Sequence, residues 1–391
     1  MHKEKNKFDH TFSTTLLISF LYPLGPAAII LMPMIVGGLI DSHGLSEQQA
    51  GNIAAVEGMG VVITSIIASF WIRRVSWVKA LIVSMLLTAL LHFISANLSD
   101  YIALLSIRFL AGLSAGAIFA VTVAALGDNR EPDRAFGVAQ AVQGVLMFAA
   151  FAAAPALLQN WTVSGLYYML AAASILMIPI VIKFPDSGID RTVLPQQGEQ
   201  ASGATVLIWL GLFASVVFFI CVFSLWTFIE RIGVVAELPG DTIGLALGAA
   251  QLVAVGGAAL AAVVSDRYGR ILPLVVVLFG QCLVLWMLIG KFGSLTFFVG
   301  AGVFQALFMI GVAYQMGAIA KIDAKGKYLV LMTAAQGLGA AFGPGIAAAL
   351  IQGDDYSAIN LMAAVCSLVS FLIFFLIIYR SRNLITAGIQ T

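Results

Sequence analysis

Glu57 and Arg108 are the residues of this sequence whose types and positions could do acid–base chemistry. Each lies inside a long apolar stretch, Glu57 about three helical turns and Arg108 about two turns from its start. A charge in such surroundings has to be paired or hydrated. A carboxyl group whose burial is opposed by a nearby arginine can gain and lose a proton near neutral pH. We therefore expect Glu57 to carry a proton with Arg108 as its electrostatic partner. His92, in the outer part of its span, could join them, although a structural role is the favoured interpretation.

The composition shows what surrounds these charges. Of the 391 residues, 61% are hydrophobic and only 10% are charged, whereas a soluble domain averages about half apolar and about a quarter charged. Apolar runs such as 361–379 approach the roughly 20 residues that a helix needs to cross a bilayer, and they lack the alternation of barrel strands. The predicted fold class is an all-α membrane protein. Cys221, Cys282 and Cys366 lie far apart inside predicted spans, so we expect no metal site, disulfide or cofactor.

Polar breaks divide the apolar sequence into twelve predicted transmembrane spans. They cover residues 14–40, 47–70, 77–96, 101–126, 135–158, 163–182, 204–231, 242–264, 271–290, 294–319, 328–351 and 357–379. The longest polar stretch, 183–203, is rich in Pro, Gly, Gln and acidic residues and is predicted to be a cytoplasmic linker. It separates an N-terminal six-helix bundle, 1–182, from a C-terminal six-helix bundle, 204–391.

The distribution of Lys and Arg predicts the orientation in the membrane. With both termini in the cytoplasm, every Lys and Arg except Arg108, Arg231 and Lys291 falls in or beside a cytoplasmic segment. The opposite face then carries acidic residues such as Asp41 and Glu237. We therefore expect a multi-pass plasma-membrane protein, and the bacterial inner membrane is the expected location.

The loop after the eighth span carries the most specific motif. It reads SDRYGR over 265–270 and separates two spans, and its carboxylate could accept charge-assisted hydrogen bonds from the neighbouring arginines. Together with two six-helix halves and a central linker, this loop resembles the signature Gly-x-Leu-[Ala/Ser]-Asp-Arg-[Phe/Tyr]-Gly-Arg-[Arg/Lys] of the major facilitator superfamily. The resemblance covers nearly the whole chain and implies that family's twelve-helix fold. It also implies a cytoplasmic gate made by Asp266, Arg267, Gly269 and Arg270.

The corresponding loop of the first half departs from this pattern. Around Arg73 and Arg74 it keeps basic residues but lacks the Asp and the Gly. We expect both arginines to belong to the gate, which would rely more heavily on the second half. Arg108, Gly112 and Gly116 resemble the family's fourth-helix pattern, in which the arginine is tied to proton coupling. The two glycines allow another helix to approach closely.

The resemblance builds the substrate cavity mainly from the first, fourth, seventh and tenth spans. The residues that we expect to line it are Tyr22, Ser114, Phe223, Trp226, Gln305, Phe308 and Tyr314. Such a cavity is aromatic with few polar groups and suits an amphipathic or aromatic solute. At the outer end of the seventh span, Glu230 and Arg231 need not pair with each other. They could form an outer gate, but we expect ordinary interfacial charges.

The sequence predicts a secondary transporter rather than an enzyme. GLSAG at 112–116 matches the GxSxG motif of hydrolases, but that motif needs a strand-to-helix turn and here it lies within one apolar helix. A phosphate-binding P-loop is absent from the sequence, so an ion gradient, most simply of protons, is the expected energy source. We expect symport, with uptake of a small organic acid, aromatic acids included.

Two alternatives stay open. The first is proton-antiport efflux of amphipathic compounds or drugs, because the glycine–proline run at 339–345 resembles the Gly-Pro motif of drug antiporters. In those exporters the motif belongs to the fifth span, which here lacks the glycines. The second, more remote, is a non-transporting membrane receptor. The expected partners are a small-molecule solute, protons and the lipid bilayer. With a net charge of +1 no nucleic acid is expected, and we expect a monomer.

Overall fold

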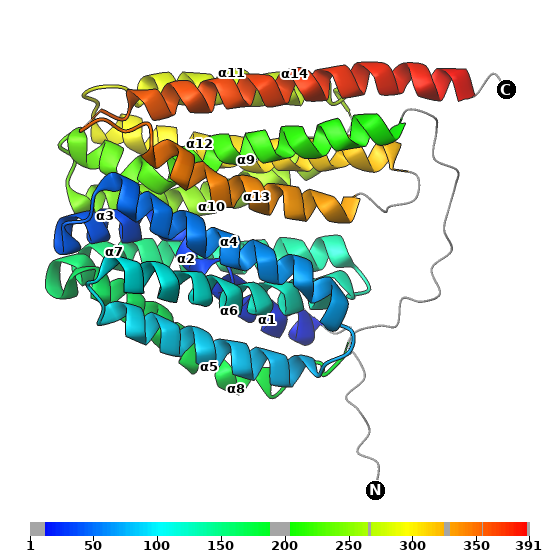
Figure 1. The fold of residues 1–391 in the computed structure, drawn as a ribbon. Helices are drawn as coiled ribbons and strands as arrows, with labels where there is room; N and C mark the ends of the chain where they lie inside the picture. The colour runs from blue at the N-terminus through cyan, green and yellow to red at the C-terminus, as the bar shows by residue number, and fades with distance from the viewer. Residues whose placement is uncertain (1–11, 188–203, 265–266, 324–328, 354, 389–391) are drawn as a thin grey trace, which may run out of the picture. The chain divides into compact units, whose positions relative to one another are not determined.

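The computed structural model describes residues 12–187, 204–264, 267–323, 329–353 and 355–388. These residues form helices and their connections, and none of them belongs to a β-strand (Figure 1). Asp266 and nearly all of the predicted linker lie outside the described residues. The chain forms two compact units, Met1–Val193 and Leu194–Thr391, which we call the first unit and the second unit.

Six predicted spans of the first unit correspond to nine helical segments. In chain order these are α1 (Phe12–Leu21), the 3-10 helix η1 (Tyr22–Leu24), α2 (Ala27–Ile30), α3 (Met32–His43), α4 (Glu47–Trp71), α5 (Trp77–Ala96), α6 (Tyr101–Gly127), α7 (Pro132–Leu176) and α8 (Ile178–Val181). Prolines break the first span, because Pro23 lies in η1, Pro26 precedes α2 and Pro33 begins α3. The first span is therefore divided into short helical segments.

Helix α7 contains the fifth and sixth predicted spans. Its backbone leaves the helical conformation at Trp161 and Thr162, and Thr162 has a φ of 55°. The two limbs on either side of this break match the predicted spans 135–158 and 163–182. Helix α4 begins with a capping box, in which Ser46 and Gln49 exchange side-chain to backbone hydrogen bonds.

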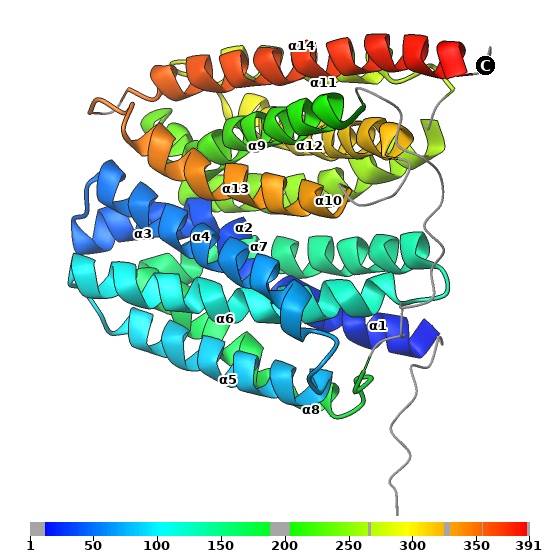
Figure 2. The same ribbon diagram turned by 45° about the vertical axis from the view of Figure 1, so that its right-hand side comes forward.

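The second unit follows the predicted spans one helix at a time. Its helices are α9 (Ala204–Val235), α10 (Gly240–Val264), α11 (Ile271–Met287), α12 (Ser294–Ile322), α13 (Leu329–Ala348) and α14 (Ser357–Gly388). In Figures 1 and 2, α11 and α14 lie side by side along one face of this unit. The connection after α9 is tied to the one before α12 by an ion pair between Glu237 Oε1 and Lys291 Nζ at 2.6 Å. The hydrogen bond and charge of Lys291 lower the pKa of Glu237.

The lengths and apolar character of the helices agree with a twelve-span membrane protein. Eight of the described helices are individually long and apolar enough to cross a bilayer, and α7 among them contains two spans. The remaining three spans are the broken first one, the 17-residue α11 and the 20-residue α13. The predicted fold class is confirmed.

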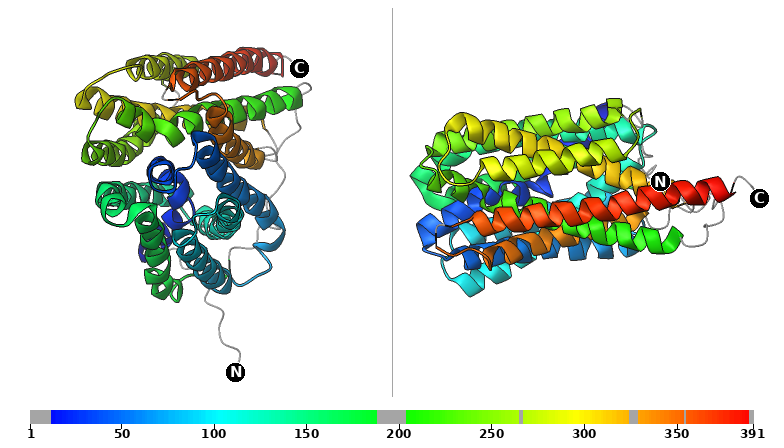
Figure 3. Two further views of the ribbon diagram at one scale, coloured as in Figure 1. Left: turned by 60° about the vertical axis from the view of Figure 1, so that its left-hand side comes forward. Right: turned by 90° about the horizontal axis from the view of Figure 1, so that it is seen from above.

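Within each unit the helices pack lengthwise against one another (Figure 3). In the first unit, α6 contacts both α4 and α5, and α5 also contacts α7. In the second unit, α9 packs on α13, and α10 packs on α12. The pairing of α4 with α6 determines the geometry of the candidate site.

Candidate functional site

Glu57 of α4 and Arg108 of α6 form a buried ion pair in the first unit. Only 1% of Glu57 and 0% of Arg108 is exposed. Arg108 Nε lies 3.1 Å from Glu57 Oε2, and Arg108 Nη2 donates a second hydrogen bond to Glu57 Oε1. This two-point contact between a planar guanidinium and a carboxylate is the strongest common form of charge-assisted hydrogen bond. The structure therefore brings the two predicted proton-coupling residues together.

Glycines allow the backbones of α4 and α6 to come this close. A Cβ atom on Gly112 would lie 2.1 Å from the carbonyl oxygen of Glu57, and one on Gly60 would lie 2.5 Å from that of Phe109. Gly116 is in a similar position, because its Cβ would lie 2.8 Å from the Val61 oxygen. The helix contact predicted from the glycine spacing is confirmed. It holds the Glu57 and Arg108 side chains within direct reach of each other.

Two further helices complete the surroundings of Arg108. Its Nη1 lies 2.9 Å from His92 Nδ1 and 3.4 Å from Ser95 Oγ, both on α5. Its Cζ lies 4.9 Å from the centre of the Tyr167 ring on α7, within the range of a cation–π contact. His92, for which a structural role was the favoured interpretation, thus joins the pair by a direct contact with the arginine, the alternative that the sequence left open.

The contact with Arg108 fixes the proton position on His92. A guanidinium has N–H donors and no acceptor, so His92 Nδ1 has to accept the hydrogen bond. The neutral ring then carries its proton on Nε2. The His92 ring also stacks on Tyr167, with 6.4 Å between ring centres. Arg108 is thus enclosed by a carboxylate, an imidazole, a hydroxyl and an aromatic face.

Several residues predicted for the substrate cavity are aromatic neighbours in the second unit. Phe308 of α12 is 6.2 Å from Phe223 of α9 between ring centres, and 5.3 Å from Phe219. Phe218 joins the same cluster at 6.2 Å from Phe308. Trp226 of α9 is 3% exposed. We call the residues Phe218, Phe219, Phe223 and Phe308 the aromatic cluster.

The other predicted cavity residues have more varied surroundings. Ser114 is hydrogen-bonded to Thr88 of α5 at 2.8 Å. Tyr22 and Tyr314 lie in the hydrophobic cores of the first and second units respectively. Gln305 is buried and makes no hydrogen bond to another described residue. Its amide is therefore the one in this predicted set that is left without a partner in the described part of the chain.

The predicted cytoplasmic gate is described in part. Asp266 lies outside the described residues, so its role stays a prediction. Gly269 has a φ of 69°, a left-handed conformation that favours glycine. Arg270 donates a hydrogen bond to the Gly317 carbonyl of α12, and the Arg267 N–H donates to the Val264 carbonyl at 3.1 Å.

The first-half loop has an ion pair of its own. Arg73 binds both oxygens of Asp128 at the end of α6, with 2.9 Å between Nη2 and Oδ1. The carboxylate of Asp128 is 0% exposed, whereas the Arg73 side chain is 38% exposed. The neighbouring Arg74 is exposed, and no side-chain partner of it is found within the described ranges. Only one of the two predicted gate arginines is therefore held by α6.

This difference gives a matched test of the two arginines. Arg73→Ala should lower the free energy of unfolding by about 1–2 kcal/mol, because a buried carboxylate loses a charged partner that is itself partly screened by solvent. Arg74→Ala should change it by less than about 0.5 kcal/mol. Unfolding of the purified variants in the same detergent provides the measurement. Equal effects at the two positions would contradict the assignment.

Sequence reasoning was wrong about Glu230 and Arg231. They do pair, with Arg231 Nε 3.0 Å from Glu230 Oε2, and each is 7% exposed. Adjacent residues leave a helix in different directions, but both side chains are long enough to bend toward each other. The pair is therefore an internal part of the second unit rather than an ordinary interfacial charge.

The two units repeat the close helix contact but not its charges. Gly257 of α10 approaches Ala306 of α12 as Gly60 approaches Phe109, since a Gly257 Cβ would lie 2.6 Å from the Ala306 oxygen. Each residue of the second contact lies 197 positions after its counterpart. The same shift places Ala254 at the position of Glu57 and Gln305 at that of Arg108. A buried ion pair at this close helix contact is therefore found in the first unit and not in the second.

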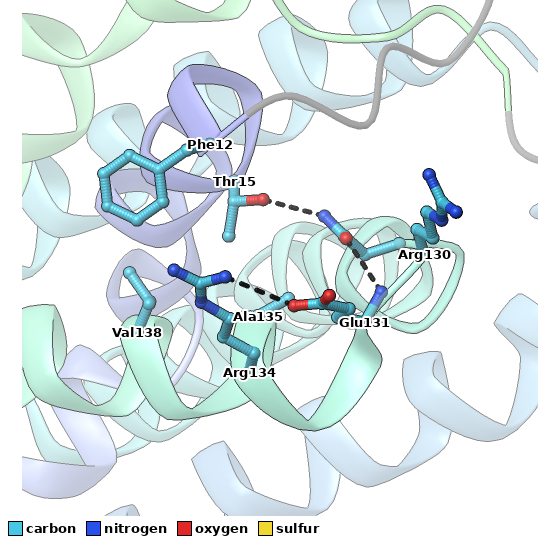
Figure 4. Close-up of a pocket in the computed structure, with 8 residues that line it drawn as sticks. Phe12, Thr15, Arg130, Glu131, Arg134, Ala135 and Val138 are labelled. Carbon is cyan, nitrogen blue, oxygen red and sulfur yellow. Dashed lines mark hydrogen bonds and ion pairs between the residues drawn. The ribbon is translucent and has the colours of Figure 1, made fainter.

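A separate polar pocket of about 300 Å³ lies where α1 begins and α6 leads into α7 (Figure 4). Asn129 Nδ2 donates to Thr15 Oγ1 at 2.7 Å, and Arg134 Nη1 lies 3.3 Å from Glu131 Oε2. The residues predicted for the coupling site, cavity and gate do not line it. Most of its polar side chains bind one another, whereas Arg130 has no side-chain partner among the described residues.

Comparisons with known proteins agree with this fold. A family model described as Major Facilitator Superfamily matches residues 15–294 and 236–387. A mutant of the nucleoside transporter NupG is similar in structure, with a TM-score of 0.75 and 13% identity over 93% of this chain and 99% of the other. A D-xylose-proton symporter gives a TM-score of 0.74 with 13% identity, covering 93% of this chain and 97% of the other.

A third similar structure is a bacterial homologue of the human lysosomal transporter Spinster. Its TM-score is 0.70 with 14% identity, over 96% of this chain and 97% of the other. No curated protein sequence matches the chain. At these identities the structural similarity establishes the fold alone.

Proposed function

Since this chain belongs to the major facilitator superfamily, we propose that it is a proton-coupled secondary transporter of a small organic acid, working by alternating access. It is a multi-pass membrane transporter. The proposal adds that it is coupled to protons, that it carries an organic acid and that it works in the direction of uptake. The observation that carries the proposal is the ion pair between Glu57 and Arg108, buried inside the first unit.

The pair can serve as a proton-dependent charge. With Glu57 ionised, the two side chains neutralise each other. A proton on Glu57 removes the negative charge and leaves Arg108 with only neutral partners, namely His92, Ser95 and Tyr167. An uncompensated charge in such a place costs several kcal/mol. Protonation of Glu57 therefore favours either a rearrangement of the packing or the arrival of an anion.

An organic anion as the cargo satisfies this requirement. The anion would enter together with the proton and neutralise Arg108, whose counterion the proton has removed. Movement of both in the same direction is symport, and an inward proton gradient would then drive uptake. The aromatic cluster of the second unit supports a cargo with an apolar or aromatic body. The D-xylose-proton symporter, similar in fold, is by its description coupled to protons.

Orientation and cellular location belong to the same proposal. The positively charged segments support an orientation with both termini in the cytoplasm. The proposed location is a bacterial inner membrane, where a proton gradient is available. Residues 265–270, with Arg73 and Arg74, would form the cytoplasmic gate. The transporter would act as a monomer, with each unit contributing different chemistry: the ion pair from the first and the aromatic cluster from the second.

Transport by Glu57→Gln tests the coupling. A thermal-shift screen of carboxylic acids on the purified protein first selects the acid that stabilises it most. In proteoliposomes, the native protein should accumulate this acid under an inward proton gradient. Glu57→Gln should lose this accumulation by at least about tenfold, because an amide cannot carry the proton. It should keep exchange of labelled for unlabelled acid across the membrane.

Glu47→Gln is the matched control, since Glu47 lies at the start of the same helix. It should accumulate the acid like the native protein. Undiminished proton-driven accumulation by Glu57→Gln would overturn the role of Glu57. A native protein that moved none of the screened acids would instead favour the receptor alternative.

A further inference from the structure

A second cavity lies within the first unit, next to the ion pair. Its volume is about 280 Å³, and it lies between the broken first span and the two limbs of α7. The walls are made mainly of apolar side chains, such as Phe20, Leu31, Met147 and Met169. The residues predicted for the substrate cavity do not line it. Its volume is near the lower end of the about 300–1,000 Å³ found for small-molecule sites.

One wall of this cavity carries a free hydrogen-bond donor. His92 lines it and is 4% exposed. Its Nδ1 accepts from Arg108, so Nε2 carries the proton, and no hydrogen-bond partner of Nε2 occurs among the described residues. The other polar lining residue, Ser174, already donates to the Leu170 carbonyl at 3.0 Å. His92 Nε2 is therefore available to donate to an acceptor that enters the cavity.

The broken backbone supports the same interpretation. Pro23, Leu24 and Ala27, at the break between η1 and α2, all line the cavity. Interrupted helices inside a membrane protein are tolerated where they line a cavity, and in transporters they commonly mark binding sites. The break, the apolar walls and the free donor therefore meet at one place.

We propose that this cavity binds a small amphipathic carboxylate, with its apolar body between the first span and α7 and its carboxylate accepting a hydrogen bond from His92 Nε2. Donation by Arg108 to the other ring nitrogen polarises the imidazole and strengthens this donor. Only the His92 ring would separate such a carboxylate from the positive charge of Arg108. The inference rests on the proposed function, whose cargo is an organic acid, and assigns that acid a further binding site inside the first unit, distinct from the aromatic cluster.

Binding of labelled 4-phenylbutyrate to the purified full-length protein, measured by scintillation proximity, tests this site without requiring transport. The native protein should bind it, and the uncharged 4-phenylbutan-1-ol should compete at least about tenfold more weakly, because a hydrogen bond to a charged acceptor is the stronger one. His92→Phe should weaken binding by about tenfold for the same reason.

Two alanines of α7 provide a matched pair that leaves Arg108 untouched. Ala173 lines the cavity, whereas the adjacent Ala172 is exposed on the outside of the helix. Ala173→Leu should fill the cavity and abolish binding, and Ala172→Leu should bind like the native protein. Unchanged affinity in Ala173→Leu, or equal competition by the alcohol, would overturn the site; so would displacement of the probe by phospholipid alone.

The outcomes of this experiment and of the transport test are separable. Binding that responds to Ala173→Leu while Glu57→Gln still accumulates acid would uphold the site and reject the coupling. Loss of proton-driven accumulation in Glu57→Gln with no binding in this cavity would do the reverse.

Discussion

Arg108→Met is expected to lower the free energy of unfolding by about 3–5 kcal/mol, because it leaves the carboxyl group of Glu57 buried without its charged partner. Glu57 is 1% exposed and accepts both hydrogen bonds from this one side chain. Protonation of Glu57 would recover part of the loss, so the destabilisation should shrink as the pH is lowered. Denaturant-induced unfolding of the variant in detergent at several pH values provides the measurement.

A double variant distinguishes the loss of the ion pair from the cost of leaving one charge buried alone. Glu57→Gln with Arg108→Met removes both charges, and it should recover most of the stability that Arg108→Met loses, since a buried ion pair can often be replaced by neutral groups at little cost. Arg130→Met is the control for removing an arginine, because Arg130 is exposed. A double variant as unstable as the single one would show that Glu57 and Arg108 do not act as a pair.

The second large effect is expected at Gly112. Gly112→Ala places a Cβ 2.1 Å from the carbonyl oxygen of Glu57, well inside contact distance, and the atom that it meets is backbone and cannot rotate away. The helices α4 and α6 would have to separate, which should cost about 3 kcal/mol and weaken the hydrogen bonds between Glu57 and Arg108. Thermal unfolding of the purified variant measures this loss.

Gly137→Ala in α7 is the matched control with the opposite expected sign. A Cβ on Gly137 meets no atom within 4 Å, so the change should stabilise the protein by about 0.5–1 kcal/mol through helix propensity. If Gly112→Ala were as harmless as Gly137→Ala, the close contact between α4 and α6 would not exist in the native protein.

The ion pair could be predicted from the sequence because two simple measures agreed. Hydropathy gave the ends of both spans, and counting from the outer side put Glu57 and Arg108 at similar depth. The glycines at 112 and 116 then indicated which face of the fourth span approaches another helix. Comparable depth was the reason to expect that the two side chains could meet, and the glycines indicated only that another helix comes close.

The remaining partners of Arg108 could not be predicted in the same way. Tyr167 and Ser95 lie on spans that are apolar all round, so the sequence carries no periodicity to show which face points inward. The tyrosine in the sixth span was a possible signal, but an aromatic residue in a membrane helix is common. His92 could join the pair by its depth in the third span, but its distance from Arg108 depends on how α5 is rotated against α6, which the sequence does not show.

The sequence and the structure indicate a repeat between the two halves of the chain at different residues and with different offsets. Gln143-Gly144 and Gln336-Gly337 pointed to an offset of about 193 residues. The close helix contacts instead correspond at 197 residues, since loops of different length shift the register between helices. Only the contact register shows that Ala254 and Gln305 replace the charged pair.

The order of the ion pair along the chain has a consequence for biosynthesis. Glu57 precedes Arg108 by 51 residues, so the ribosome delivers the acid to the membrane before the base. A lone arginine at the centre of an inserting helix costs about 2.5–3.5 kcal/mol on scales measured at the translocon. When α6 leaves the translocon, α4 is already in the bilayer and can supply the counterion. A permuted gene that translated α6 first would present its arginine to lipid with no partner waiting.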